Sequence, residues 1–188
     1  MSQHQEGASR YGWLITTRRF VMAAAGCAAV LPAASRALAA TNGPVLPEDE
    51  KFMRMALDEA RRGDFPFGTV IVRDNKVIAR GRNQGITKDD PTAHGEMEAI
   101  RSCLAEHGSK VLVGSTLYTS GEPCAMCMGA ILWCHIGRLV FAASTAQLAT
   151  KIDQIMLTAA DVAAKAPFAP IAITGSVLAD EAMALFSK

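Results

Sequence analysis

Apolar and polar positions follow a helical spacing and then a strand-like spacing in the first half of the chain. Between Phe52 and Ala60, apolar residues recur three or four positions apart, which predicts a helix that ends before Gly63. Two runs rich in β-branched residues, 68–73 and 76–81, then flank Asp74-Asn75, a pair typical of tight turns. The pattern therefore predicts a helix followed by a β-hairpin.

Strands and helices alternate through the rest of the chain. Residues 40–46 are expected to form a loop, and the remaining apolar runs predict helices over 94–107, 123–136, 145–164 and 178–187 and strands over 116–119, 138–143 and 170–175. Such alternation predicts an α/β fold, a three-layer α/β/α sandwich with a five-stranded mixed sheet. A helix between the last two strands requires a crossover, so we expect those strands to be parallel.

The first 39 residues follow a different pattern and are not expected to join the fold. Arg18-Arg19 stand before the apolar run 20–31, and Ala37-Leu38-Ala39 has the small residues of a cleavage site. About 12 apolar residues are too few to span a bilayer, which needs roughly 20. We therefore predict a twin-arginine signal peptide over 1–39, a folded domain over 40–188, and export to the periplasm by the twin-arginine route.

Length and charge narrow the class of protein further. At 188 residues, half of them hydrophobic, the chain can build one ordinary core. The net charge of +1 conceals an excess of three positive charges in residues 1–39. Of 19 Lys+Arg and 18 Asp+Glu, residues 40–188 hold 15 and 17. We expect no membrane span in residues 40–188. The mild acidity of this domain disfavours nucleic acid as a partner, because surfaces that bind nucleic acid are usually basic.

Two short segments carry residue types that bind metals. The first contains His94 and Glu96, and the second contains Cys124, which stands 30 positions after His94, and Cys127. One imidazole and two thiolates suit a tetrahedral Zn²⁺ whose fourth position holds a reactive water, and that water becomes hydroxide near neutral pH. The two cysteines are three positions apart, so they share one helix face. The carboxylate of Glu96 is then free to move protons beside the water.

The cysteine pair has other interpretations when it is taken alone. A C-x-x-C pair also occurs in structural zinc sites and in thiol oxidoreductases. A non-catalytic zinc-binding protein would keep the metal and have no use for Glu96. Pro123 before the pair and the H-x-E segment upstream favour catalysis, because together they form the signature of zinc-dependent nucleobase deaminases.

The folded domain resembles the cytidine-deaminase-like zinc deaminase superfamily along nearly its whole length. The run 119–133 is most similar to bacterial guanine deaminases, whereas Gly95 departs from the Ala usual in that branch. The resemblance implies one Zn²⁺ per chain held by His94, Cys124 and Cys127, with Glu96 as proton shuttle. It also implies a homodimer, and substrate contacts that it assigns to Asn83, Phe67, Trp133 and, as a second proton shuttle, Asp153.

The resulting expectation is a hydrolytic deaminase of a nucleobase or nucleoside. Guanine, converted to xanthine and ammonia, is the favoured substrate, and cytosine or cytidine is the alternative. The tRNA-adenosine branch of the superfamily carries a Gly-rich basic segment after the fourth strand, which residues 143–147 do not resemble. A tRNA substrate is therefore less favoured.

Overall fold

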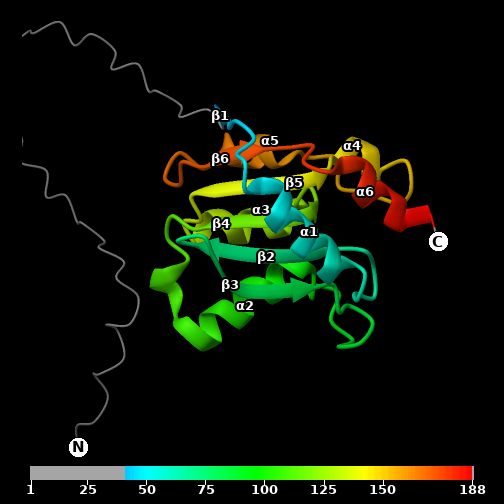
Figure 1. Cartoon of the computed structure of the whole chain (residues 1–188), viewed down its shortest axis with the longest axis horizontal. Coiled ribbons are helices and arrows are strands. Elements are labelled where there is room, and N and C mark those ends of the chain that lie inside the picture. The colour runs from blue at the N-terminus through cyan, green and yellow to red at the C-terminus, as the bar shows by residue number, and fades with distance from the viewer. Residues whose placement is uncertain (1–40, 188) are drawn as a thin grey trace, which may run out of the picture. The chain divides into compact units, whose positions relative to one another are not determined.

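The computed structural model describes residues 41–187, which form a sheet covered by helices on both faces (Figure 1). The predicted signal peptide lies outside the described residues, so export stays a prediction. The strands are β1 (Thr41–Asn42), β2 (Gly68–Arg73), β3 (Lys76–Arg82), β4 (Thr116–Gly121), β5 (Arg138–Ala143) and β6 (Ala172–Thr174). The helices are α1 (Asp49–Ala60), α2 (Gly95–His107), α3 (Ala125–Trp133), α4 (Thr145–Leu148), α5 (Ala159–Ala163) and α6 (Ala179–Ala184), with 3₁₀ turns η1 (Ser109–Val111) and η2 (Leu185–Ser187).

The sheet confirms the predicted α/β class and the mixed strand pairing. The strand order is β1-β6-β5-β4-β2-β3. β2 pairs antiparallel with β3 and β4, whereas β4, β5 and β6 are parallel. The sheet contains the five expected strands and an additional strand, β1, which pairs parallel with β6. The loop prediction for 40–46 is therefore wrong at Thr41 and Asn42, which cover an otherwise unpaired sheet edge.

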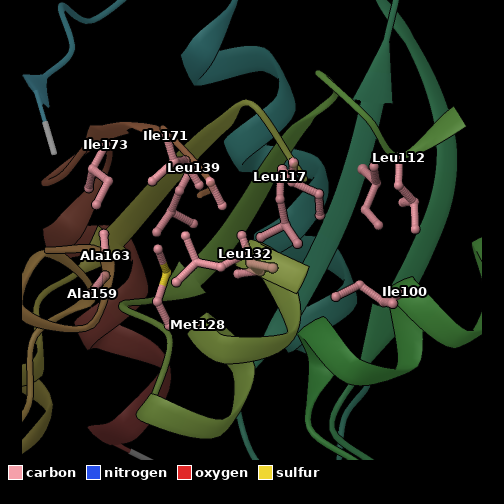
Figure 2. Packing of buried hydrophobic residues seen from close by; sticks show 14 of the residues in the cluster. Ile100, Leu112, Leu117, Met128, Leu132, Leu139, Ala159, Ala163, Ile171 and Ile173 are labelled. Atoms are coloured by element: carbon pink, nitrogen blue, oxygen red, sulfur yellow. The ribbon is translucent and has the colours of Figure 1, made fainter. Parts of the chain in front are cut away.

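Alternation of side chains along the strands divides the core into two halves. On one face, the residues of the sheet pack against α2, α3 and α5, as Figure 2 shows for Ile100, Met128 and Ala159. On the other face they pack against α1 and α6. In β4, Leu117 faces α2 and α3 while its neighbour Tyr118 faces α1, which is the period of two expected for a strand buried on both sides.

The region between β5 and β6 differs from the prediction of one continuous helix. It forms two short helices, α4 and α5, separated by the residues 149–158, which we name the α4–α5 segment. Each helix begins with a capping box, Ser144 with Gln147 and Thr158 with Asp161. The second box starts a new helix, so the Ala-rich composition overstated the length of the first. No helix in the described range is both long and apolar enough to cross a bilayer.

Candidate active site

The predicted metal ligands meet at the ends of two helices. His94 is the N-cap of α2 and Cys124 the N-cap of α3, with Cys127 in the first turn of α3. The Nδ1 atom of His94 lies 3.7 Å from the Sγ atom of Cys124 and 3.6 Å from that of Cys127. All three candidate ligand atoms lie within 4.8 Å of one another. Residues 30 positions apart in sequence therefore converge on one point.

These separations fit a tetrahedral zinc ion. Zn–N and Zn–S bonds of about 2.0 and 2.3 Å at a tetrahedral angle place nitrogen and sulfur about 3.5 Å apart. The two measured nitrogen–sulfur distances agree with that value. One imidazole and two thiols also match the donor types that zinc prefers. The three residues can therefore hold Zn²⁺ and leave a fourth position open toward the adjoining cavity.

Contacts among the three ligand side chains shift their pKa values. A hydrogen bond from the Cys127 thiol, reinforced by His94, lowers the pKa of Cys124 to about 4. The same bond, together with burial, raises the pKa of Cys127. Hydrogen bonding to Cys124 raises the pKa of His94. Zinc binds cysteine as the thiolate, so metal binding at this triad releases protons and depends on pH.

Glu96 lies in the first turn of α2 and is almost fully buried, with 4% of its surface exposed. Burial raises the pKa of its carboxyl group, which favours a group that can both accept and release a proton. The Oγ1 atom of Thr119 lies 3.2 Å from its Oε1 atom, and Thr69 lies 3.2 Å from Thr119 in turn. Two threonines from adjacent strands therefore fix the orientation of the carboxyl group.

A cavity of about 720 Å³ opens beside Glu96, His94 and Cys124 at the carboxyl ends of β4 and β5. Ligands bind at this end of parallel strands in open α/β sheets. Its further lining residues are Phe65, Phe67, Asn83, Gly85, Ile86, Asp89, Pro91, Glu122, Ile152, Asp153, Gln154 and Ile155. This volume is sufficient for a base or a nucleoside.

The structure brings three of the four expected substrate residues to the cavity. Phe67 forms part of the wall, and its ring packs edge-on against Phe186 at 5.4 Å. Asn83 is buried, and its Oδ1 atom accepts a hydrogen bond from the backbone of Gly85, so a turn holds the side chain at the wall. Asp153 reaches the cavity from the α4–α5 segment.

Trp133 is the residue that the structure does not bring to the site. It lies at the end of α3, outside the cavity lining, and is 60% exposed. Its ring lies 4.8 Å from that of Phe168, on the surface. Helix α3 ends at Trp133 and not at Ile136 as predicted, because His135 adopts a left-handed backbone conformation that stops the helix.

Two residues with clear geometric roles were not singled out from the sequence. Thr119 donates a hydrogen bond to Glu96 and so orients it. Glu122, which lines the cavity, accepts hydrogen bonds from the first residues of α4 and α5. Their position in the sequence could have pointed to these two residues, since Thr119 and Glu122 stand just before the predicted cysteine ligands. The sequence shows their proximity to Cys124 but not their hydrogen-bond partners, which come from distant elements.

The charges around the cavity are all of one sign. Among the described residues that line it, the charged groups are Asp89, Glu96, Glu122 and Asp153, with neither lysine nor arginine. Two bound thiolates offset the charge of a Zn²⁺ ion. The cavity therefore repels anions and favours neutral or cationic ligands that carry hydrogen-bond donors.

A buried carboxyl group beside a His-Cys-Cys triad, in an α/β/α sandwich, defines the class of zinc-dependent hydrolytic deaminases. The chain belongs to the family described as the cytidine and deoxycytidylate deaminase zinc-binding region, whose model matches residues 46–143. That match covers more than half of the chain and includes all three zinc ligands and Glu96.

Several known proteins resemble the chain. Guanine deaminase of Bacillus subtilis is 43% identical over 99 residues, and a tRNA-specific adenosine deaminase of Haemophilus influenzae is 46% identical over 101 residues. The matches cover 50% and 51% of this chain and 64% and 58% of those relatives, so less than two thirds of either relative is spanned. The structure of guanine deaminase from Nitrosomonas europaea is similar with a TM-score of 0.64 at 25% identity, over 78% of this chain and 87% of that one.

Proposed function

We propose that the chain deaminates a free purine base or its nucleoside, with guanine as the preferred substrate. Guanine and water would yield xanthine and ammonia. The observation that carries this proposal is the cavity beside the zinc ligands, whose walls are apolar and whose charged groups are all acidic. The two sequence relatives each match about half of the chain at nearly equal identity, so the proposal is argued from the cavity and not from their likeness.

Guanine matches the cavity in shape and in hydrogen-bond donors. A planar purine suits a cavity whose lining includes the apolar side chains of Phe67, Ile152 and Ile155. Its ring N1–H group is a donor, which suits a carboxylate such as that of Asp89 or Asp153, while the 2-amino group that leaves faces Glu96. The phosphates of a nucleotide or a tRNA would instead meet these carboxylates, and among the described residues of the lining no lysine or arginine offsets them. The charges of the cavity therefore favour a base or nucleoside over tRNA.

The protein groups around the metal site divide the work of the reaction. His94, Cys124 and Cys127 would hold a Zn²⁺ ion, which would supply the nucleophile by lowering the pKa of its water to about 7. Glu96 accepts the proton of that water and delivers it to a ring nitrogen and then to the departing amino group. Thr119 keeps the Glu96 carboxyl aimed at the reacting atoms throughout. Asn83 binds the base from the wall of the cavity, where its amide group is held in place by Gly85.

The test is a comparison of ammonia release from a panel of substrates by the purified zinc-loaded chain. Guanine, guanosine, adenine, cytosine, cytidine, deoxycytidylate and an adenosine-containing tRNA anticodon stem-loop are each assayed at several concentrations. We expect kcat/KM to be highest for guanine, with at least about a tenfold advantage over bases that lack its donor pattern. Deamination of the stem-loop or of deoxycytidylate in preference to every free base and nucleoside would contradict the proposal.

A further inference from the structure

Glu122 is a buried acidic residue that the proposed reaction does not use. It directly follows β4, two positions before the zinc ligand Cys124, and only 8% of its surface is exposed. Its Oε2 atom accepts a hydrogen bond from the backbone N–H of Thr145 at 2.7 Å. Its Oε1 atom accepts one from the backbone N–H of Ala159 at 2.8 Å. Both carboxylate oxygens are therefore engaged with main-chain donors.

The two donors have a common significance for the chain. Thr145 is the first residue of α4 and Ala159 is the first residue of α5, so the pair brackets the α4–α5 segment. A single carboxylate thus connects the turn that carries Cys124 to two points of the chain. One is the start of α4, ahead of the segment, and the other is the start of α5, directly after it. Backbone N–H groups in the first turn of a helix have no partner inside that helix, which leaves these two available to an acceptor.

The α4–α5 segment depends on such an anchor for its position. It contributes Ile152, Asp153, Gln154 and Ile155 to the cavity, yet none of its ten residues, 149–158, is buried. A segment without buried side chains gains little from core packing. Its place against the cavity is consequently set by its two ends.

We propose that Glu122 is a positioning residue that holds the α4–α5 segment as the outer wall of the substrate cavity. It acts on substrate binding through Ile152, Asp153 and Ile155. This inference rests on the proposed function for its kinetic part alone. The side-chain contacts of Glu122 run to α4 and α5, whereas its own backbone N–H is bound to the carbonyl of Ala143, so the metal-bearing turn is held independently of the carboxylate.

Two variants remove the anchor from opposite sides. Glu122→Gln replaces one carboxylate oxygen by an NH₂ group. This group cannot accept the hydrogen bond of the backbone N–H that it then faces. Ala159→Pro leaves the carboxylate in place and removes one of its donors, at a first helical position where the backbone angle suits proline although the site itself is buried. Glu106→Gln is the matched control, since it makes the same chemical change at an exposed site far from the cavity.

Three properties of the zinc-loaded chain are measured for each variant. Zinc content reports on the metal site, and the rate of trypsin cleavage after Lys151, an exposed residue of the α4–α5 segment, reports on the wall. KM and kcat are measured with the base that the wild type converts fastest. For both anchor variants we expect zinc to stay at one per chain, cleavage after Lys151 to accelerate roughly tenfold, and KM to rise roughly tenfold with little change in kcat.

The possible results separate this inference from the proposed function. Unchanged cleavage after Lys151 in both variants would overturn the positioning role, whatever the substrate proves to be. Loss of zinc or of the folded state in both variants would make Glu122 a structural residue of the metal site, and equal falls in kcat and kcat/KM would place it in the chemical step. If the wild type does not deaminate guanine while cleavage still accelerates, the proposed substrate fails and the positioning role stands.

Discussion

Glu96 is the residue on which the chemistry depends, because its carboxyl group is the one held beside the metal triad by hydroxyl groups of the sheet. Thr119 and Thr69 form a short hydrogen-bonded chain that ends on its Oε1 atom. Burial disfavours the charged carboxylate and raises its pKa, which favours a group that can accept a proton and release it again. A residue in this setting is suited to carry a proton from water to a leaving group.

Glu96→Gln should therefore abolish turnover while leaving the metal in place. The amide keeps an oxygen that can accept the hydrogen bond from Thr119, but it cannot carry a proton. We expect ammonia release to fall by about 10²–10⁴-fold, the usual contribution of general acid–base catalysis. Zinc analysis and kinetics on the same sample provide the measurement. A variant with normal zinc content and near-normal kcat would refute the role of Glu96.

At this scale the sequence predicts the residues whose chemistry is local. His94, Cys124 and Cys127 could be identified because metal binding requires those side chains at that spacing. The partners of Glu96 and Glu122 could not be identified, since Thr69, Thr145 and Ala159 reach them only through strand pairing and helix placement. Trp133 lies outside the cavity lining, and its place in a family-like run did not determine which way its side chain points.

At the scale of elements, the first turn of α2 is positioned by its close contact with β3. A Cβ atom on Gly81 would lie 2.2 Å from the carbonyl oxygen of Gly95 and 2.3 Å from the backbone nitrogen of Ala99. Real side-chain contacts are never that short, so glycine at position 81 is what permits this approach. The approach places His94 and Glu96 beside β2 and β4.

Gly81→Ala should push α2 away from the sheet and weaken the metal site. We expect overpacking to lower the free energy of unfolding by about 1–3 kcal/mol, accompanied by faster loss of zinc to a chelator. Gly129→Ala provides a control of opposite sign: nothing lies within 4 Å of its added Cβ atom, and alanine is favoured over glycine inside a helix. Urea unfolding of both variants tests the contrast, and equal stability of Gly81→Ala and wild type would contradict it.

The elements themselves were predictable to different degrees. The hairpin and the helices α1 and α2 follow directly from local periodicity and turn residues. The division between α4 and α5 was missed because alanine favours helix wherever it occurs, while Thr158 begins a new helix by capping it. The pairing of β1 with β6 was missed because it joins chain segments more than 120 residues apart.

At the scale of the whole molecule, the end of the sheet opposite the cavity is held together by a buried charge cluster. Arg138 at the start of β5 makes two hydrogen bonds to Asp49, of 2.6 and 2.7 Å. Tyr118 and the backbone of Leu46 donate to the same carboxylate at 3.0 and 2.7 Å. The cluster joins α1, β4 and β5 to the residues that lead from β1. It therefore stabilises the framework on which the site at the other end is built.

This cluster makes stability depend on pH in acid. Burial alone would raise the pKa of Asp49, but the hydrogen bonds from Arg138, Leu46 and Tyr118 outweigh burial and lower the pKa below its ordinary value of 3.8. A depressed pKa in the folded state gives stability that is complete above 3.8 and is lost as the pH falls through the folded-state pKa.

Asp49→Asn should remove this contribution at neutral pH. We expect the free energy of unfolding at pH 7 to fall by about 2–3 kcal/mol, the scale of hydrogen bonds to a charged group. The difference from wild type should shrink as the pH is lowered below 3.8, because the wild-type carboxyl group then becomes neutral as well. Denaturant unfolding of the variant and the wild type, from pH 7 to below 3.8, measures this difference in the free energy of unfolding. A difference that stays constant or grows in acid would contradict the assignment.

The most direct test of the central claim is ammonia release from guanine before and after removal of zinc. The purified chain is assayed as isolated, then after chelation and dialysis, and then after Zn²⁺ is restored to one ion per chain. We expect ammonia and xanthine in equal amounts, loss of both products when the metal is removed, and their return when zinc is restored. Undiminished ammonia release from the metal-free chain, or no release from any base or nucleoside with the zinc site filled, would contradict it.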